Sequence, residues 1–185
     1  MNNKIKLFGI IAMLAVISVG AFAQQYEDGG NFQVDRVGNG IKIWEYLGTN
    51  TVVNIPLTIQ GLPVTIIGAG AFSNQRSLTS VTIPNSVTTI ENLAFAECQS
   101  LTSIIIPNRV TKIEEQAFRG CLALTSVTFQ GTIPLGGFHE NAFFRLGDLR
   151  TKFYTANQIN GTPGTFTREP VRTVAESASS IWTKR

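Results

Sequence analysis

Few side chains in this sequence could carry out acid–base or nucleophilic chemistry. The chain of 185 residues contains a single histidine, His139. No neighbouring residues complete the spacing of a catalytic triad or of a metal site around it. We therefore interpret His139 as a solvated loop residue.

Two glutamates, Glu91 and Glu114, lie 23 residues apart, and Glu115 adjoins the second. Stacked carboxylates could act as general acid and base or bind calcium, but a solubilising role at the surface is the simpler interpretation. The sequence has no Gly-rich phosphate loop, G-x-S-x-G, H-E-x-x-H or calcium-binding nonapeptide. It therefore predicts neither an enzyme nor a cofactor or metal site.

The spacing of the glutamates reflects a repeat that positions the other side chains. The segment Leu78–Asn85 returns as Leu101–Asn108, and a third copy begins at Leu124, with steps of 23 residues. Such a period predicts a solenoid. We expect each coil to contain a strand closed by proline, a turn and one or two turns of helix. The residues expected to point inward in one coil are Leu78, Val81, Ile83, Val87, Ile90, Ala94, Phe95 and Cys98.

The same repeat relates the two cysteines, Cys98 and Cys121. Stacked coils lie about 4.8 Å apart, which falls within the Cα range of a disulfide. Equivalent side chains of a solenoid nevertheless project in parallel rather than toward each other. The pattern favours two reduced, buried thiols, with a disulfide as the alternative.

Residues 1–23 are predicted to form a secretory signal peptide. Lys4 and Lys6 precede an apolar run from Leu7 to Val19, and a small-x-small pattern ends at Ala23. Cleavage is expected between Ala23 and Gln24. The run is short for a membrane span, so an uncleaved anchor is the less favoured alternative. We expect an exported protein, periplasmic, secreted or on the cell surface, without a stable membrane span after cleavage.

Charge argues against nucleic acid as a partner. The net charge of +3 includes the two lysines of the signal segment, and removing them leaves 13 basic and 12 acidic residues. The remaining balance offers no patch for phosphates.

The chain divides around the repeats. Residues 24–30 read as a flexible lead, and residues 31–50 as an N-terminal β-hairpin cap turning at Gly38-Asn39-Gly40. Residues 51–155 would hold about four coils, with insertions near 60–63 and within 132–140. The last of these coils would end in a strand over 149–155.

Residues 156–185 are predicted to form a C-terminal β cap. It would contain a strand at 165–168, then a mobile segment over 169–180, and would end with residues 181–183. Terminal coils need such caps because one of their faces would otherwise expose the core.

The outward positions of the repeated strands form a surface that we call the strand face. Its side chains are mostly small and uncharged, which limits the entropy lost when a partner docks. The sequence contains no indication of the oligomeric state. The candidate ligand-binding residues are Asn54, Ser80, Thr82, Ser103, Ile105, Ser126 and Thr128.

The repeat resembles the BspA-like, or treponemal-type, leucine-rich repeats. The resemblance rests on Leu78–Ile90, on the Ala94-Phe95-x-x-Cys98 motif and on their copies, and its flanking modules extend it over residues 32–185. It implies an α/β repeat solenoid: a short leucine-rich-repeat stack with a parallel sheet on one face, short helices or turns on the other and β-hairpin-like caps. The chain departs from the family in having few repeats, Gln75 at the first cysteine position and no visible anchor.

Members of that family are typically exported or displayed on the surface, and some are adhesins. The resemblance therefore implies a non-catalytic exported binding module that engages a protein, such as a host matrix protein, or a glycan through the strand face. The alternative is a structural protein of the periplasm or envelope with no dedicated ligand.

Overall fold

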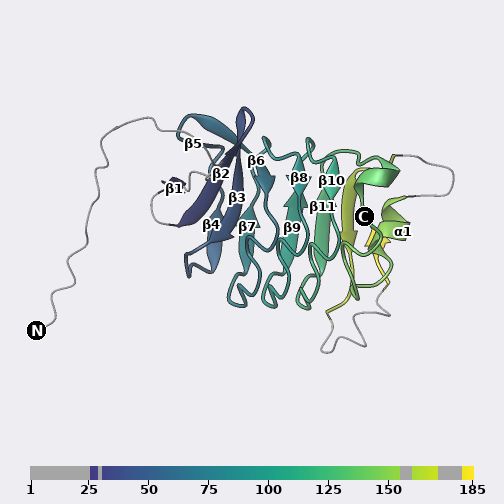
Figure 1. Cartoon of the computed structure of the whole chain (residues 1–185). Coiled ribbons are helices and arrows are strands. Elements are labelled where there is room, and N and C mark those ends of the chain that lie inside the picture. Colours follow the sequence, from purple (N-terminus) through teal and green to yellow (C-terminus); the bar gives the residue numbers. More distant parts are fainter. Residues whose placement is uncertain (1–25, 29–30, 155–159, 171–180) are drawn as a thin grey trace, which may run out of the picture.

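The computed structural model describes residues 26–28, 31–154, 160–170 and 181–185. Its coils stack side by side in one direction, with a hairpin at one end and a short helix near the other (Figure 1). The predictions of a signal peptide over 1–23 and of cleavage between Ala23 and Gln24 lie outside the described residues.

The first side of each coil carries the repeated strand. These strands are β4 (Val52–Asn54), β7 (Ser80–Thr82), β9 (Ser103–Ile106) and β11 (Ser126–Phe129). β4 pairs with β7 and β9 with β11, in both cases parallel and in register. Because successive side chains of a strand alternate, each strand buries one row and exposes the other.

The second side is another parallel sheet, built from β6 (Leu62–Ile67), β8 (Thr89–Ile90) and β10 (Lys112–Ile113). The predicted N-terminal hairpin is present as β2 (Phe32–Val37) and β3 (Gly40–Tyr46), and β3 continues this sheet by pairing in parallel with β6. Within the expected flexible lead, β1 (Tyr26–Asp28) pairs antiparallel with β2.

The third side corrects the α/β expectation, because residues 92–97 form turns rather than a helix. The backbone is left-handed at Leu93 (φ 56°) and again at Glu97 (φ 61°), which no α-helix can accommodate. Backbone bonds run along the stack instead, such as Phe95 N to Ala117 O at 2.7 Å. The fold is thus a strand-rich solenoid with minimal helix.

The core is a continuous apolar column, and every side chain expected to point inward is buried. Aromatic rings stack along its centre with one ring from each coil. Their successive centroids lie between 4.6 and 5.3 Å apart. The stacked residues are Tyr46, Phe72, Phe95, Phe118 and Phe143.

The insertion expected near residues 60–63 is a tight hairpin between β5 (Thr58–Ile59) and β6. Its two turn residues, Gln60 and Gly61, both have positive φ (52° and 76°), as a type I′ turn requires. The later insertion includes a 3-10 turn, η1 (Leu135–Gly137). Both insertions leave the stack unbroken.

The strand predicted over residues 149–155 is wrong, because α1 (Leu149–Phe153) is a helix. Leu149 and Phe153 are its buried residues, and their i, i+4 spacing puts them on one helical face. An ion pair from Lys152 Nζ to Asp148 Oδ2 at 3.7 Å has the same spacing.

The C-terminal strands extend the first sheet rather than the second. β12 (Gly164–Thr167) pairs antiparallel with β11, and β13 (Thr183–Lys184) pairs antiparallel with β12. Of the segment expected to be mobile, residues 171–180 lie outside the described residues. Each end of the stack is thus continued on one sheet only.

Arg168 and Trp182 fasten the C-terminal strands to the last coils. The Arg168 guanidinium donates to the carbonyls of Leu124 (2.7 Å) and Leu122 (3.0 Å) and lies 5.4 Å from the Trp182 ring. Burial lowers the pKa of Arg168. Trp182 Nε1 donates to Leu146 O at 2.6 Å.

Candidate binding surface

The strand face consists of two outward rows that run across the coils. The in-register pairs place Asn54 beside Thr82 and Ile105 beside Thr128. Asn54, Thr82 and Ser103 are exposed, and Ile105 keeps 51% of its surface accessible. The other three candidates, Ser80, Ser126 and Thr128, are half-buried.

Four of the seven candidate residues come together in a groove of about 260 Å³ between β7 and β9. Ser80 and Thr82 form one wall, and Ser103 and Ile105 form the other. The groove therefore combines hydroxyl groups with one exposed apolar side chain. Asn54, Ser126 and Thr128 lie outside its lining.

The groove coincides with a break in the first sheet, because among the described strands β7 and β9 are neighbours without ladder pairing. Between β9 and β11, Gln130 N donates to Ile106 O at 3.0 Å. Pro107 occupies the equivalent position one coil earlier and has no N–H to donate to the carbonyl of Ile83, the residue that follows β7. The same proline that ends β9 thus removes one rung at this break.

The structure adds residues to the strand face that sequence reasoning missed. β12 continues the two rows with Thr165 beside Thr128 and Thr167 beside Ser126, and the hydroxyls of Thr128 and Thr165 lie 2.9 Å apart. The alternating Thr-Phe-Thr sequence signalled a strand but not its partner. Asn85 and Gln130 complete the groove from loops whose position depends on the stacking of the coils.

The residues singled out for acid–base chemistry hold turns. Glu91 Oε2 accepts a hydrogen bond from Ala69 N (3.0 Å) and pairs with Lys42 Nζ (2.6 Å). Glu114 repeats the arrangement on Asn92 N at 3.3 Å. Each carboxylate therefore caps a turn of the preceding coil.

His139 lies in a shallow groove of about 370 Å³ with Glu114 and Glu115. Its Nδ1 accepts a hydrogen bond from Asn141 N at 3.1 Å. The residues lining the groove include no serine, threonine or cysteine. Across the described part of the chain, no group of three His, Cys, Asp or Glu residues could hold a metal ion.

Cys98 and Cys121 are buried free thiols, as the parallel projection of equivalent side chains predicted. Cys98 Sγ donates to Phe72 O and Cys121 Sγ to Phe95 O, both at 3.1 Å. Burial raises the pKa of the Cys121 thiol well above its usual value. Each thiol thus joins its coil to the preceding one through a hydrogen bond.

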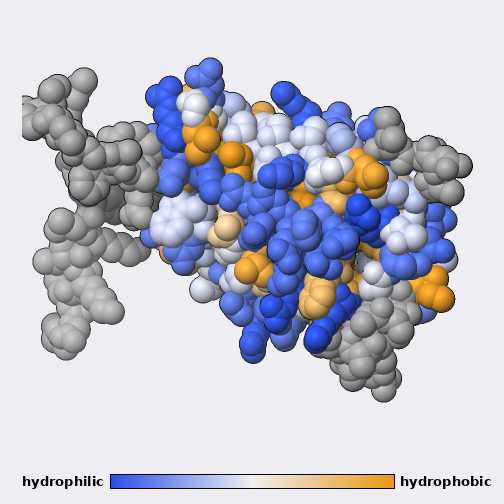
Figure 2. Space-filling view, turned by 45° about the vertical axis from the view of Figure 1, so that its right-hand side comes forward, coloured by the Kyte–Doolittle hydropathy of each residue, from blue (hydrophilic) through white to orange (hydrophobic). Residues whose placement is uncertain are grey.

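The surface offers no single apolar area on the side seen in Figure 2, where hydrophobic residues are scattered among hydrophilic ones. On the strand face, Val52 (56% exposed) and Ile105 are the large apolar residues in solvent.

The helices within the described ranges are too short, or too polar, to cross a membrane.

The comparison with protein families gives one match. A family described as "BspA type Leucine rich repeat region (6 copies)" matches residues 51–167. No curated protein matches the chain.

Solved bacterial structures are similar to the chain. A leucine rich cell surface protein from Faecalibacterium prausnitzii A2-165 shares 36% identity over 57% of this chain and 32% of its own length, with a TM-score of 0.52. The T. pallidum leucine-rich repeat protein shares 25% identity over 55% of this chain and 70% of its own (TM-score 0.37). A leucine-rich repeat protein from Bacteroides capillosus shares 23% identity over 58% of this chain and 99% of its own length, with a TM-score of 0.44. The matched region spans about a third of the F. prausnitzii protein.

Proposed function

Because the chain belongs to the BspA type leucine-rich repeat family, we propose that it is an exported, non-catalytic protein that binds a protein or glycan ligand through the strand face. The observation that carries this proposal is the groove between β7 and β9, where Ser80, Thr82, Ser103 and Ile105 converge. Their side chains are short, so little conformational entropy is lost when a ligand orders them.

The neighbouring proteins add support of a general kind. The similar F. prausnitzii structure is described as that of a cell surface protein, which agrees with the signal-peptide pattern of residues 1–23. N-terminal sequencing of the protein recovered from producing cells tests export directly. A mature chain that begins at Gln24 is the expected result, and a chain that retains Met1 would contradict it.

Substitution of the groove tests the binding face. Thr82→Lys together with Ile105→Lys places two long charged side chains on opposite walls of the groove. The ligand panel consists of immobilised host matrix proteins and immobilised neutral glycans. The variant is expected to lose binding that the wild type shows, with an unchanged circular dichroism spectrum.

Thr111→Lys is the matched control, because Thr111 is exposed and lies outside the groove. Equal binding by the groove variant and the wild type would exclude the strand face. If the wild type binds nothing on the panel and is protected from protease in intact cells, the structural role in the envelope replaces the adhesin.

A further inference from the structure

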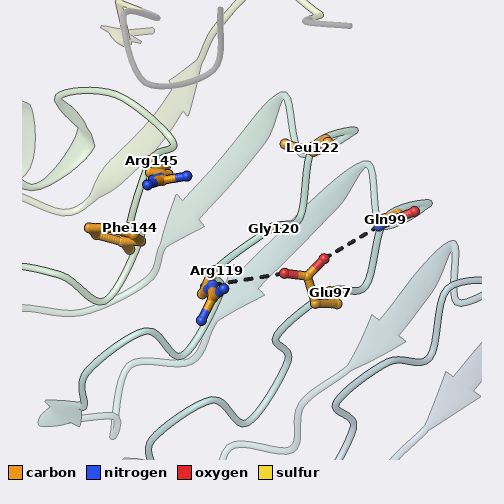
Figure 3. Close-up of a pocket in the computed structure, with 7 residues that line it drawn as sticks. All are labelled: Glu97, Gln99, Arg119, Gly120, Leu122, Phe144 and Arg145. Atoms are coloured by element: carbon orange, nitrogen blue, oxygen red, sulfur yellow. Dashed lines mark hydrogen bonds and ion pairs between the residues drawn. The ribbon is translucent and has the colours of Figure 1, made fainter. Parts of the chain in front are cut away.

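A second pocket, of about 110 Å³, lies on the turn side of the coils (Figure 3). Three successive loops contribute to it. Glu97 and Gln99 come from one loop, Arg119, Gly120 and Leu122 from the next, and Phe144 and Arg145 from the third. This pocket shares no residue with the groove on the strand face.

The pocket exists because one coil has a glycine, Gly120, at a position where the other coils carry a side chain. Asn74, Glu97, Gly120 and Arg145 all adopt a left-handed conformation, with φ between 61° and 74°. Three of these residues carry side chains, and Gly120 leaves a notch between Glu97 and Arg145. A Cβ placed on Gly120 would come within 2.6 Å of the Glu97 carboxylate, which leans over that space.

The charges around the notch are unequal. Glu97 Oε1 lies 3.8 Å from Arg119 Nε, and Glu97 Oε2 accepts a hydrogen bond from Gln99 Nε2 at 3.3 Å. Arg119 thus neutralises Glu97. The Arg145 guanidinium lies 5.2 Å from the centre of the Phe144 ring, and no carboxylate within the described ranges pairs with it. The notch therefore has one positive charge in excess.

We propose that this notch binds a single carboxylate group, with Arg145 as the principal contact. The planar guanidinium offers parallel N–H donors that match the two oxygens of a carboxylate. Phe144 supports the guanidinium from one side, and Leu122 supplies an apolar wall for the carbon chain next to the carboxylate. The ligand is thus a monocarboxylate with an aliphatic stem.

The geometry favours a carboxylate over a phosphate. The notch has room for a group of only a few atoms. The Glu97 carboxylate also borders the pocket and would repel a dianion more strongly than a monoanion. A carboxylate of this kind occurs both in small free acids and at the C-terminus of a polypeptide.

NMR titration of the labelled mature protein tests the proposal with four probes. These are butyrate, inorganic phosphate, and an acetylated Gly-Ala-Leu peptide in two forms, with a free C-terminal carboxylate and with an amide. Butyrate and the free peptide are expected to shift the Gly120 amide and the Arg145 Nε–H resonances. Tighter binding of the peptide identifies a polypeptide terminus as the source, whereas tighter binding of butyrate identifies a small acid, and both outcomes support the site.

Two variants and a control sharpen the test. Arg145→Gln should weaken butyrate binding about tenfold, in keeping with the loss of a charge-assisted hydrogen bond. Glu97→Gln should strengthen binding, because it removes the competing carboxylate and releases Arg119. Arg109→Gln changes an exposed arginine outside the pocket and should have no effect.

The proposal fails on any of three results. These are shifts in Arg145→Gln as large as in the wild type, equal binding of the amidated peptide, and no shift with either carboxylate. Preferred binding of phosphate would also overturn the proposed ligand. Failure here leaves the strand face untouched, because the two sites share no residues.

Discussion

Gln75 Nε2 donates a hydrogen bond to the carbonyl oxygen of Tyr46 at 3.2 Å. In the next two coils the equivalent residues are Cys98 and Cys121, whose thiols donate to Phe72 and Phe95. An amide in the first coil thus replaces the thiol of the later ones and makes the same link between coils. The missing cysteine of the first repeat is a substitution of donors rather than a lost contact.

Removing this donor should destabilise the N-terminal end of the stack. Gln75→Ala leaves the half-buried Tyr46 carbonyl without this bond, which should cost about 1 kcal/mol of unfolding free energy. Urea denaturation followed by circular dichroism measures the change. Gln130→Ala, at an exposed glutamine, is the control and should stay within about 0.5 kcal/mol of the wild type. Equal effects of the two substitutions would show that the link contributes nothing.

The buried thiol of Cys121 should make stability depend on pH above 9. Its pKa in the folded protein is raised by burial, whereas in the unfolded chain the thiol ionises near its ordinary value of 9.0. Above that pH the unfolded state binds fewer protons, so the unfolding free energy falls as pH rises, by at most about 1.4 kcal/mol per unit from this group.

Cys121→Ala supplies the test of that slope. The variant should be less stable at neutral pH because it leaves a cavity, but its unfolding free energy should fall less steeply between pH 9 and 10. At higher pH the ionisation of Tyr154 also contributes to the slope, because burial raises its pKa to about 12. Parallel slopes for variant and wild type would contradict the assignment.

The turn conformation at Leu93 gives a prediction that separates a turn from a helix. In a helix interior, Leu→Gly costs about 1 kcal/mol. Leu93 instead has a φ of 56°, which glycine adopts without strain, as Gly70 does at the equivalent position (φ 68°). Leu93→Gly should therefore raise the unfolding free energy by up to about 1 kcal/mol.

Leu122→Gly is the control for that substitution, because Leu122 has no positive φ and is half-buried. The unfolding free energy of this variant, measured by thermal denaturation, should fall by about 1 kcal/mol or more. A loss of similar size at Leu93 would show that its conformation carries no strain.

Arg168 should be required for the C-terminal end of the stack. Arg168→Met removes the donors to the Leu122 and Leu124 carbonyls and should cost about 2 to 4 kcal/mol. In a Trp44→Phe background, Trp182 fluorescence should shift to longer wavelength as the indole gains access to water. Arg185→Met, at an exposed arginine, should change neither stability nor fluorescence.

The repeat predicted the coil because its apolar spacing depends only on local sequence. Leu78, Val81 and Phe95 are buried at the positions that the period requires. The helix expected after each strand is absent. The spacing of Ala94, Phe95 and Cys98 suits a tight turn as well as a helix, so the pattern could not distinguish the two. Left-handed φ values at Leu93 and Glu97 have no signature in these residue types.

Contacts between segments that lie far apart in the chain could not be predicted from the sequence. The outward rows could be read from alternation, but the groove needs the break between β7 and β9 and loop residues such as Asn85. Phe153 illustrates the same limit. The residues around it have the pattern of a strand, and only the burial of Phe153 together with Leu149 indicates a helix.

The two ends of the molecule are finished on different sheets, since β3 continues the second sheet and β12 continues the first. Each cap therefore pairs with the coils through one sheet only. The number of coils is therefore free to change by tandem duplication: an extra copy of residues 101–123 would meet a coil like its own on each side. The gene could lengthen or shorten in units of one coil while both caps kept their own partners.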